Sequence, residues 1–166
     1  LIKWAFGYDP DHAEFNTLRD EFLNNYQNNI CVKSQLFDGI DELLIQLENS
    51  NVAWGIVTNK ITRFTEPLLK VMGLHTRSQA NISGDTTEFS KPHPAPILKA
   101  AEICKVLPQD CVYVGDDLRD IEAGKAAGMK TVAAAYGYCG CDEHITEWGA
   151  DFIITHPSEL KSIIFS

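Results

Sequence analysis

The chain has 166 residues, of which 45% are hydrophobic, and its 14 basic and 23 acidic side chains give a net charge of −9. This length fits one domain with at most a small appendage, and the apolar share is sufficient for a packed core, which excludes an intrinsically disordered chain. The acidic sequence has no cluster of Lys and Arg to hold nucleic acid or anionic lipid. It also contains neither a run of 18 apolar residues nor a signal-peptide pattern.

The first predicted element is an amphipathic helix over residues 11–29, in which Phe15, Leu18 and Phe22 recur at spacings of three and four residues. A second helix follows the turn residues Asp38 and Gly39 and ends near residues 49–51. No strand is predicted between these helices, so residues 1–34 are expected to form a separate helical layer.

From residue 52 onward, short apolar runs alternate with segments of helical periodicity. This alternation predicts an α/β fold, in which a mostly parallel sheet carries helices on both faces and binds ligands at the carboxyl ends of its strands. The predicted strands cover residues 52–58, 80–83, 111–114, 131–135 and 152–155, and the predicted helical segments cover residues 63–72, 94–106, 117–127, 144–148 and 158–164.

The cysteine content indicates a reducing compartment. The number of cysteines is odd and their spacing is scattered, which favours reduced thiols and predicts a cytoplasmic protein. The two that lie one residue apart, Cys139 and Cys141, lack a second pair or a nearby histidine cluster, so a zinc site is not predicted there. The five cysteines are Cys31, Cys104, Cys111, Cys139 and Cys141.

The residues after the predicted strand 111–114 suggest metal chemistry. Here the sequence reads Gly115-Asp116-Asp117-Leu118-Arg119-Asp120 and opens into a helix. Carboxylates at close range raise one another's pKa unless a cation holds them, and Mg2+ favours a few carboxylates together with water and a substrate phosphate. The alternative is structural, because Asp116 or Asp117 would also serve as a helix N-cap and Asp120 as a first-turn acid. The segment alone supports both interpretations equally.

Two other strand ends carry groups that suit a phosphate. Thr58 and Asn59 come directly after the apolar strand residues 54–57, where a hydroxyl and adjacent backbone N–H groups can hold phosphate oxygens. Lys91 precedes Pro92 in a proline-stiffened turn that presents its ammonium at a fixed place. Taken singly, a helix-starting threonine and a solvated loop lysine are the commoner interpretations. The joint pattern of a hydroxyl, an ammonium and an acidic segment predicts a site for a transferring phosphoryl group with Mg2+.

This order of motifs resembles that of the haloacid dehalogenase-like hydrolases over nearly the whole chain. Residues 57–60 (Val-Thr-Asn-Lys) look like the family's second motif, Lys91 with Pro92 like its third, and residues 115–120 like its fourth. Residues 36–40 resemble the lead-in helix of phosphoglycolate phosphatase-type members. Three further segments, 54–60, 63–67 and 148–151, look most similar to the branch of the N-acetylmuramic acid 6-phosphate phosphatases.

The resemblance implies a Rossmann-like α/β core over residues 35–166 and a partial helical cap over residues 1–34. It implies an Mg2+-dependent phosphomonoesterase that acts on a small soluble phosphate ester, such as phosphoglycolate or a sugar 6-phosphate, through an aspartyl phosphate. By the same resemblance, Thr58 and Asn59 bind phosphate, Lys91 neutralises the phosphoryl oxygens and the nucleophile, Asp116 ligates Mg2+, and Asp117 and Asp120 orient water or neighbouring side chains.

One part of the family pattern does not match this chain. The chemistry of the family starts from an Asp-x-Asp-Gly-Thr motif on the first, central strand. Asp9-Pro10-Asp11 has the aspartate spacing, but His12-Ala13 follows, and the distance to Thr58 is too short for a full cap. We therefore expect the nucleophile strand to be missing upstream of Leu1, with little activity of the chain alone and strand edges left open for a dimer.

Four other functions fit parts of this pattern. In a receiver-type signalling module the acids precede the hydroxyl and the lysine, whereas here Thr58 and Lys91 come first. A catalytically silent phosphate-binding scaffold gains support if the natural protein is this short. A phosphomutase on the same fold stays open, and dehalogenation is disfavoured by acids that resemble Mg2+ ligands.

Overall fold

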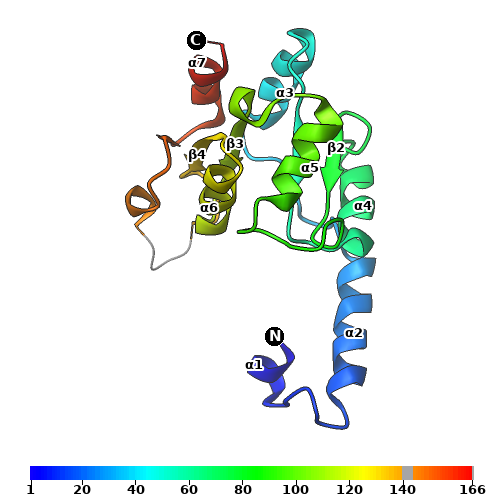
Figure 1. Cartoon of the computed structure of the whole chain (residues 1–166). Coiled ribbons are helices and arrows are strands. Elements are labelled where there is room, and N and C mark those ends of the chain that lie inside the picture. The colour runs from blue at the N-terminus through cyan, green and yellow to red at the C-terminus, as the bar shows by residue number, and fades with distance from the viewer. Residues whose placement is uncertain (140–143, 166) are drawn as a thin grey trace. The chain divides into compact units, whose positions relative to one another are not determined.

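A computed structural model describes residues 1–139 and 144–165, and it divides the chain into two compact units, Leu1–Ser34 and Gln35–Ser166 (Figure 1). We call these the N-terminal unit and the α/β unit and describe each by itself. Cys141 lies outside the described residues, so the structure does not test the Cys139–Cys141 pair. The described cysteines are free thiols. None of the described helices is both long and apolar enough to cross a membrane.

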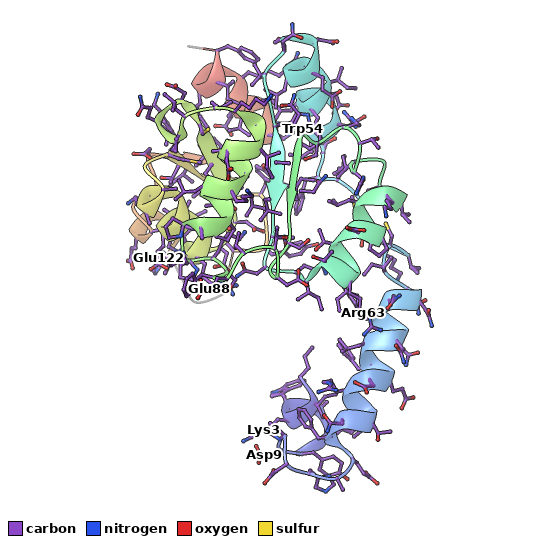
Figure 2. All side chains as sticks on the ribbon, turned by 45° about the vertical axis from the view of Figure 1, so that its right-hand side comes forward. Lys3, Asp9, Trp54, Arg63, Glu88 and Glu122 are labelled. Carbon is purple, nitrogen blue, oxygen red and sulfur yellow. The ribbon has the colours of Figure 1, made fainter. Side chains whose placement is uncertain are left out.

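The N-terminal unit consists of two helices, α1 (Ile2–Phe6) and α2 (Phe15–Asn28). Helix α2 confirms the predicted amphipathic helix, although it begins four residues later. Helix α1 was not predicted, and it shows that Asp9 follows a helix rather than a strand. The carboxylate of Asp9 lies 2.6 Å from the ammonium of Lys3 in an exposed ion pair (Figure 2). Asp9 therefore lacks the strand-end position that the nucleophile of the resembling family requires.

The α/β unit begins with helix α3 (Ile40–Asn49) and then alternates strands with helices, as predicted. Its strands are β1 (Gly55–Val57), β2 (Ala80–Ile82), β3 (Val112–Gly115), β4 (Lys130–Ala134) and β5 (Phe152–Ile154). Its helices are α4 (Thr62–Val71), α5 (Ala95–Cys104), α6 (Leu118–Ala126) and α7 (Leu160–Ile164), and short 3-10 turns lie at Pro108–Asp110, Ile145–Glu147 and Pro157–Glu159.

All strand pairings in the α/β unit are parallel, but the strands form two sheets rather than one continuous sheet. Strand β1 pairs with β2 in one sheet, and the other has the order β3-β4-β5. Within the described residues, β1 and β3 are therefore edge strands, each with one unpaired side. The prediction of a parallel α/β fold is confirmed. Because no described strand pairs with both β1 and β3, the strands form two sheets, as the expected absence of a central strand implies.

Helices cover both faces of these strands. One core cluster joins Leu43 and Leu47 of α3 to Val132 and Ile154, and Leu160 of α7 completes it. The opposite cluster joins α5 to α6 through Ile97, Ala101, Ala123 and Ala127 (Figure 1). Residues of β3 alternate between the two faces, because successive side chains of a strand point to opposite sides. Val112 and Val114 pack on the first cluster, whereas Tyr113 packs on the second.

Candidate active site

The carboxyl end of β1 presents Thr58. Its backbone N–H donates to the carbonyl of Ile82 at 2.9 Å, which extends the pairing of β1 with β2 by one residue. Its hydroxyl oxygen accepts from the backbone N–H of Lys60 at 3.1 Å. Because a hydroxyl can accept one hydrogen bond and donate another, the Thr58 O–H group can still donate a hydrogen bond to an anionic oxygen.

Asn59 joins the end of β1 to the loop that carries Lys91. Its side-chain N–H donates to the carbonyl of Lys91 at 2.9 Å, and its side-chain oxygen accepts from the backbone N–H of Lys91 at 3.0 Å. Asn59, which the family resemblance assigns to phosphate binding, thus directs its side-chain amide to the Lys91 backbone. This pair of bonds fixes where the Lys91 side chain begins.

The Lys91 ammonium lies where β1 and β3 approach each other. It donates to the carbonyl of Val57 on β1 at 3.0 Å, to the hydroxyl of Tyr113 on β3 at 3.2 Å, and to the carboxylate of Asp120 at 2.6 Å. Its side chain is only 11% exposed. The alternative interpretation of Lys91 as a solvated loop lysine therefore does not hold, and the ammonium is held in a fixed place near the ends of β1 and β3.

Asp120 lies in the first turn of α6 and is buried, with 9% of its side chain exposed. Its carboxylate packs against Gly115, where a Cβ atom would overlap the Asp120 side chain. Glycine at this position thus lets the helix approach the end of β3 closely enough for Asp120 to reach Lys91. The two charges compensate each other in a place where either one alone would be costly.

Asp117 has a structural role at the start of α6. It is the N-cap residue, and its carboxylate accepts from the backbone N–H of Arg119 at 2.9 Å and from the Arg119 guanidinium. Hydrogen bonding to the Arg119 side chain lowers the pKa of Asp117 to about 2, so the carboxylate is ionised at neutral pH. The alternative of a helix N-cap thus holds for Asp117.

Asp116 lies beside a cavity of about 350 Å3 at the carboxyl end of β3. One of its carboxylate oxygens accepts from the backbone N–H of Tyr138 at 2.7 Å, which fixes the side chain to the loop after β4. The cavity is mainly apolar, and its wall includes aromatic rings that contact each other edge to face. Its lining residues are Gln35, Leu36, Phe37, Ile40, Val114, Gly115, Asp116, Ala134, Tyr136 and Gly137.

The three carboxylates of the acidic segment therefore have three different partners. Asp116 binds a backbone amide, Asp117 caps α6, and Asp120 pairs with Lys91. Across residues 1–139 and 144–165, no group of three or more His, Cys, Asp or Glu side chains converges on one point. Asp116 and Asp117 precede α6 and Asp120 lies in its first turn, so the three side chains leave the backbone in different directions.

Comparison with known proteins identifies the family. Residues 3–134 match the family described as haloacid dehalogenase-like hydrolase, and the matched range includes Thr58, Lys91 and Asp116. The chain belongs to the haloacid dehalogenase-like hydrolases. The resemblance that the sequence analysis drew from its motifs is confirmed.

Relatives of this haloacid dehalogenase-like hydrolase are named as phosphatases. The chain is 43% identical over 166 residues to an N-acetylmuramic acid 6-phosphate phosphatase of Pseudomonas putida, covering all of this chain and 74% of the relative. It is also 43% identical over 161 residues to a phosphoglycolate phosphatase of Xylella fastidiosa, covering 97% of this chain and 70% of the relative. Among solved structures, a predicted phosphoglycolate phosphatase from Haemophilus somnus superimposes with a TM-score of 0.87 at 27% identity, over 98% of this chain and 71% of that one.

Among the carboxylates of the acidic segment in this haloacid dehalogenase-like hydrolase, Asp116 is the one that can serve as a ligand for a divalent cation. Asp116 has one carboxylate oxygen on Tyr138, and the other has no hydrogen bond among the described residues. Mg2+ commonly uses one or two carboxylates and completes its shell with water and substrate phosphate. Asp116 fits that pattern as a single ligand, and the other ligands would come from outside the described side chains.

Sequence reasoning missed one polar residue of this haloacid dehalogenase-like hydrolase. Tyr113 was assigned to an apolar strand, but its hydroxyl lies beside the ion pair of Lys91 and Asp120, 3.2 Å from the ammonium and 3.5 Å from the carboxylate. The available signal was chemical, since a tyrosine inside a buried strand needs a partner for its hydroxyl. Burial and the charge of Asp120 raise the pKa of Tyr113 far above its ordinary value, so the hydroxyl stays protonated.

Proposed function

We propose that this chain supplies the phosphate-binding and metal-binding side of a phosphomonoesterase for small soluble phosphate esters. The observation that carries this proposal is the Lys91 ammonium, which is buried at the meeting point of β1 and β3 and fixed through both its backbone and its side chain. A buried, preorganised cation stabilises charge that develops on a phosphoryl group without reorganising during the reaction.

We assign the binding of phosphate to residues at the end of β1 together with Lys91. The oxygen of the Thr58 hydroxyl already accepts from the Lys60 N–H, so its O–H group is assigned as the hydrogen-bond donor to one phosphoryl oxygen. The Lys91 ammonium neutralises another. Asn59 serves this site by positioning Lys91, since its amide is bonded to the Lys91 backbone.

We assign the metal to the end of β3. Asp116 would hold a divalent cation such as Mg2+, which supplies charge compensation between the carboxylate and the phosphoryl oxygens. Asp120 holds the Lys91 ammonium in place, and Asp117 keeps the first turn of α6 formed next to it.

The attacking group of the proposed reaction lies outside these 166 residues. The sequence contains no Asp-x-Asp-Gly-Thr motif, and Asp9 follows a helix and pairs with Lys3. In the proposed step, an aspartate oxygen forms a bond to phosphorus while the bond from phosphorus to the ester oxygen breaks and the alcohol leaves with a proton. Water then hydrolyses the aspartyl phosphate. We therefore propose little or no turnover by this chain alone.

The substrate class is proposed from the names of the relatives. One acts on N-acetylmuramic acid 6-phosphate and another is a phosphoglycolate phosphatase, and both are 43% identical to this chain, so identity does not choose between them. We propose a small phosphate ester of this kind as the substrate, residues 1–34 as part of a helical cap that limits access, and the cytoplasm as the compartment. The open edges of β1 and β3 are the proposed surface of any dimer.

Binding measurements test the proposed function without requiring turnover. Titration calorimetry of the 166-residue chain with orthophosphate should detect saturable binding that Lys91→Met abolishes and Lys99→Met leaves unchanged, because Lys99 is an exposed helix lysine paired with Glu102. Mn2+ titration with paramagnetic relaxation should detect a site that Asp116→Asn weakens and Asp110→Asn does not. Binding that is equal in Lys91→Met and wild type contradicts the proposal.

An activity measurement tests the location of the nucleophile. We expect the chain to release no orthophosphate from phosphoglycolate or from N-acetylmuramic acid 6-phosphate in the presence of Mg2+. Magnesium-dependent turnover that Asp9→Asn abolishes would instead make Asp9 the attacking group and overturn this part of the proposal.

A further inference from the structure

The three N–H donors of the Lys91 ammonium are matched by three acceptors. Asp120 lies at 2.6 Å, the carbonyl of Val57 at 3.0 Å and the hydroxyl of Tyr113 at 3.2 Å. A lysine ammonium has three donors and no acceptor. A phosphoryl oxygen can therefore bind this ammonium only by replacing one of the three partners.

The three acceptors differ in what their release would leave behind. Release of Asp120 would separate two buried charges, which is strongly unfavourable. Release of the Val57 carbonyl would leave a half-buried backbone acceptor at the end of β1 without this partner. Release of Tyr113 leaves no polar group without a partner, because its hydroxyl also lies 3.5 Å from the same Asp120 oxygen and can donate to it.

We propose that the Tyr113 hydroxyl is a resting acceptor for Lys91, and that the ammonium exchanges this hydroxyl for an oxygen of the phosphoryl group when substrate binds. Tyr113 is thus a positioning residue, and the inference rests on the proposed phosphate site. The exchange favours substrate because an ammonium bonds a charged oxygen more strongly than a neutral hydroxyl. Before substrate arrives, Tyr113 keeps the ammonium oriented through this hydrogen bond.

The variant Tyr113→Phe removes the competing acceptor and keeps the ring. We expect it to bind orthophosphate about three- to tenfold more tightly than wild type, which is the net worth of one intramolecular hydrogen bond expressed as an affinity ratio. The measurement is calorimetric titration of the whole chain with orthophosphate in EDTA, so that only the protein's own groups contribute. Tyr8→Phe is the matched control, because Tyr8 stacks on His12 in the N-terminal unit, and it should bind as wild type does.

The outcomes separate this inference from the proposed function. Loss of binding in Lys91→Met with tighter binding in Tyr113→Phe supports both. Loss of binding in Lys91→Met with equal or weaker binding in Tyr113→Phe overturns the exchange and keeps the phosphate site. No saturable binding to wild type overturns both.

A second readout follows the exchange in the wild-type chain and does not depend on the folding of the variant. Orthophosphate should shift the 15N signal of the Lys91 ammonium and also the 13Cζ signal of Tyr113, because the hydroxyl loses a hydrogen bond in the exchange. A shift at Lys91 with an unchanged Tyr113 signal contradicts the inference. An unchanged Tyr113 signal is the result expected if Tyr113 only stabilises the fold and takes no part in anion binding.

Discussion

Asn59 and Lys91 are joined by two hydrogen bonds between the side-chain amide of the first and the backbone of the second, although 32 residues separate them in the chain. This contact ties the loop after β2 to the end of β1. It therefore sets the starting point from which the Lys91 side chain reaches the gap between the two sheets. The position of the ammonium depends on this contact as much as on the ion pair with Asp120.

Asn59→Ala should weaken both folding and anion binding. Loss of two partly buried hydrogen bonds is expected to lower the free energy of unfolding by about 1–3 kcal/mol, measured by urea denaturation. Orthophosphate affinity should fall as well, because Lys91 loses its backbone anchor. Asn81→Ala is the matched control, since Asn81 bonds the His75 carbonyl away from the site. It should lower stability without changing anion affinity, and an equal loss of affinity in both variants contradicts the positioning role.

Lys91→Met should be among the most destabilising single changes in the α/β unit. It leaves Asp120 as an unpaired buried charge, which is expected to cost about 3–5 kcal/mol at neutral pH. The double variant Lys91→Met/Asp120→Leu should recover much of that loss, because no buried charge remains. Lys99→Met, at an exposed i,i+3 pair, should change stability by less than about 0.5 kcal/mol. If the double variant is less stable than Lys91→Met, the buried-charge explanation is wrong.

Asp117→Ala should reveal a pH-dependent helix cap. At pH 7 the loss of the N-cap is expected to lower stability by about 1 kcal/mol. The pKa of Asp117 is lowered to about 2 in the folded chain and is about 3.9 in an unfolded one, so the contribution of the ionised carboxylate is fully present above about pH 4 and is lost as the pH falls toward 2. Because the side chain is 41% exposed, screening keeps this contribution small.

The measurement for Asp117 is the urea midpoint of wild type and Asp117→Ala between pH 7 and pH 2.5. The difference between the two proteins should shrink as the pH falls below 4. Asp110→Ala, at an exposed aspartate in the turn before β3, is the control for a general effect of charge. A difference that grows at low pH has the opposite sign and rules out the stabilised carboxylate.

Gly115→Ala should disturb the site through a close contact rather than through backbone strain. The added Cβ would overlap the Asp120 side chain, so we expect a loss of about 1–3 kcal/mol in stability and weaker orthophosphate binding. Gly73→Ala separates the two causes. Gly73 has φ of +70° and open space around it, so alanine there should cost about 1 kcal/mol through the left-handed backbone alone and leave binding intact. Unchanged anion affinity in Gly115→Ala would argue against a tight coupling of Asp120 to the site.

Local sequence patterns were sufficient to predict the order of the elements and the family. Hydrophobic periodicity is a property of neighbouring residues, and it placed α2, α3 and the alternation from β1 to α7 correctly to within a few residues. It overestimated the length of β1, which runs only from Gly55 to Val57, while Val52 and Trp54 pack against the core ahead of it. Motif order along the chain identified the haloacid dehalogenase-like hydrolases.

The sequence by itself thus determined the α/β fold and which strand ends carry Thr58, Lys91 and Asp116, because both follow from residues close together in the chain. Only the tertiary structure decided that the strands form two sheets, that the three acids have separate partners, and that Tyr113 bonds Lys91. The cap that Asp117 makes is local, and the sequence had offered it as one interpretation. The bonds from Lys91 to Tyr113 and to Val57, in contrast, join residues that are 22 and 34 positions apart. The geometry of such long-range contacts depends on how the helices pack against the strands, and no local pattern encodes it.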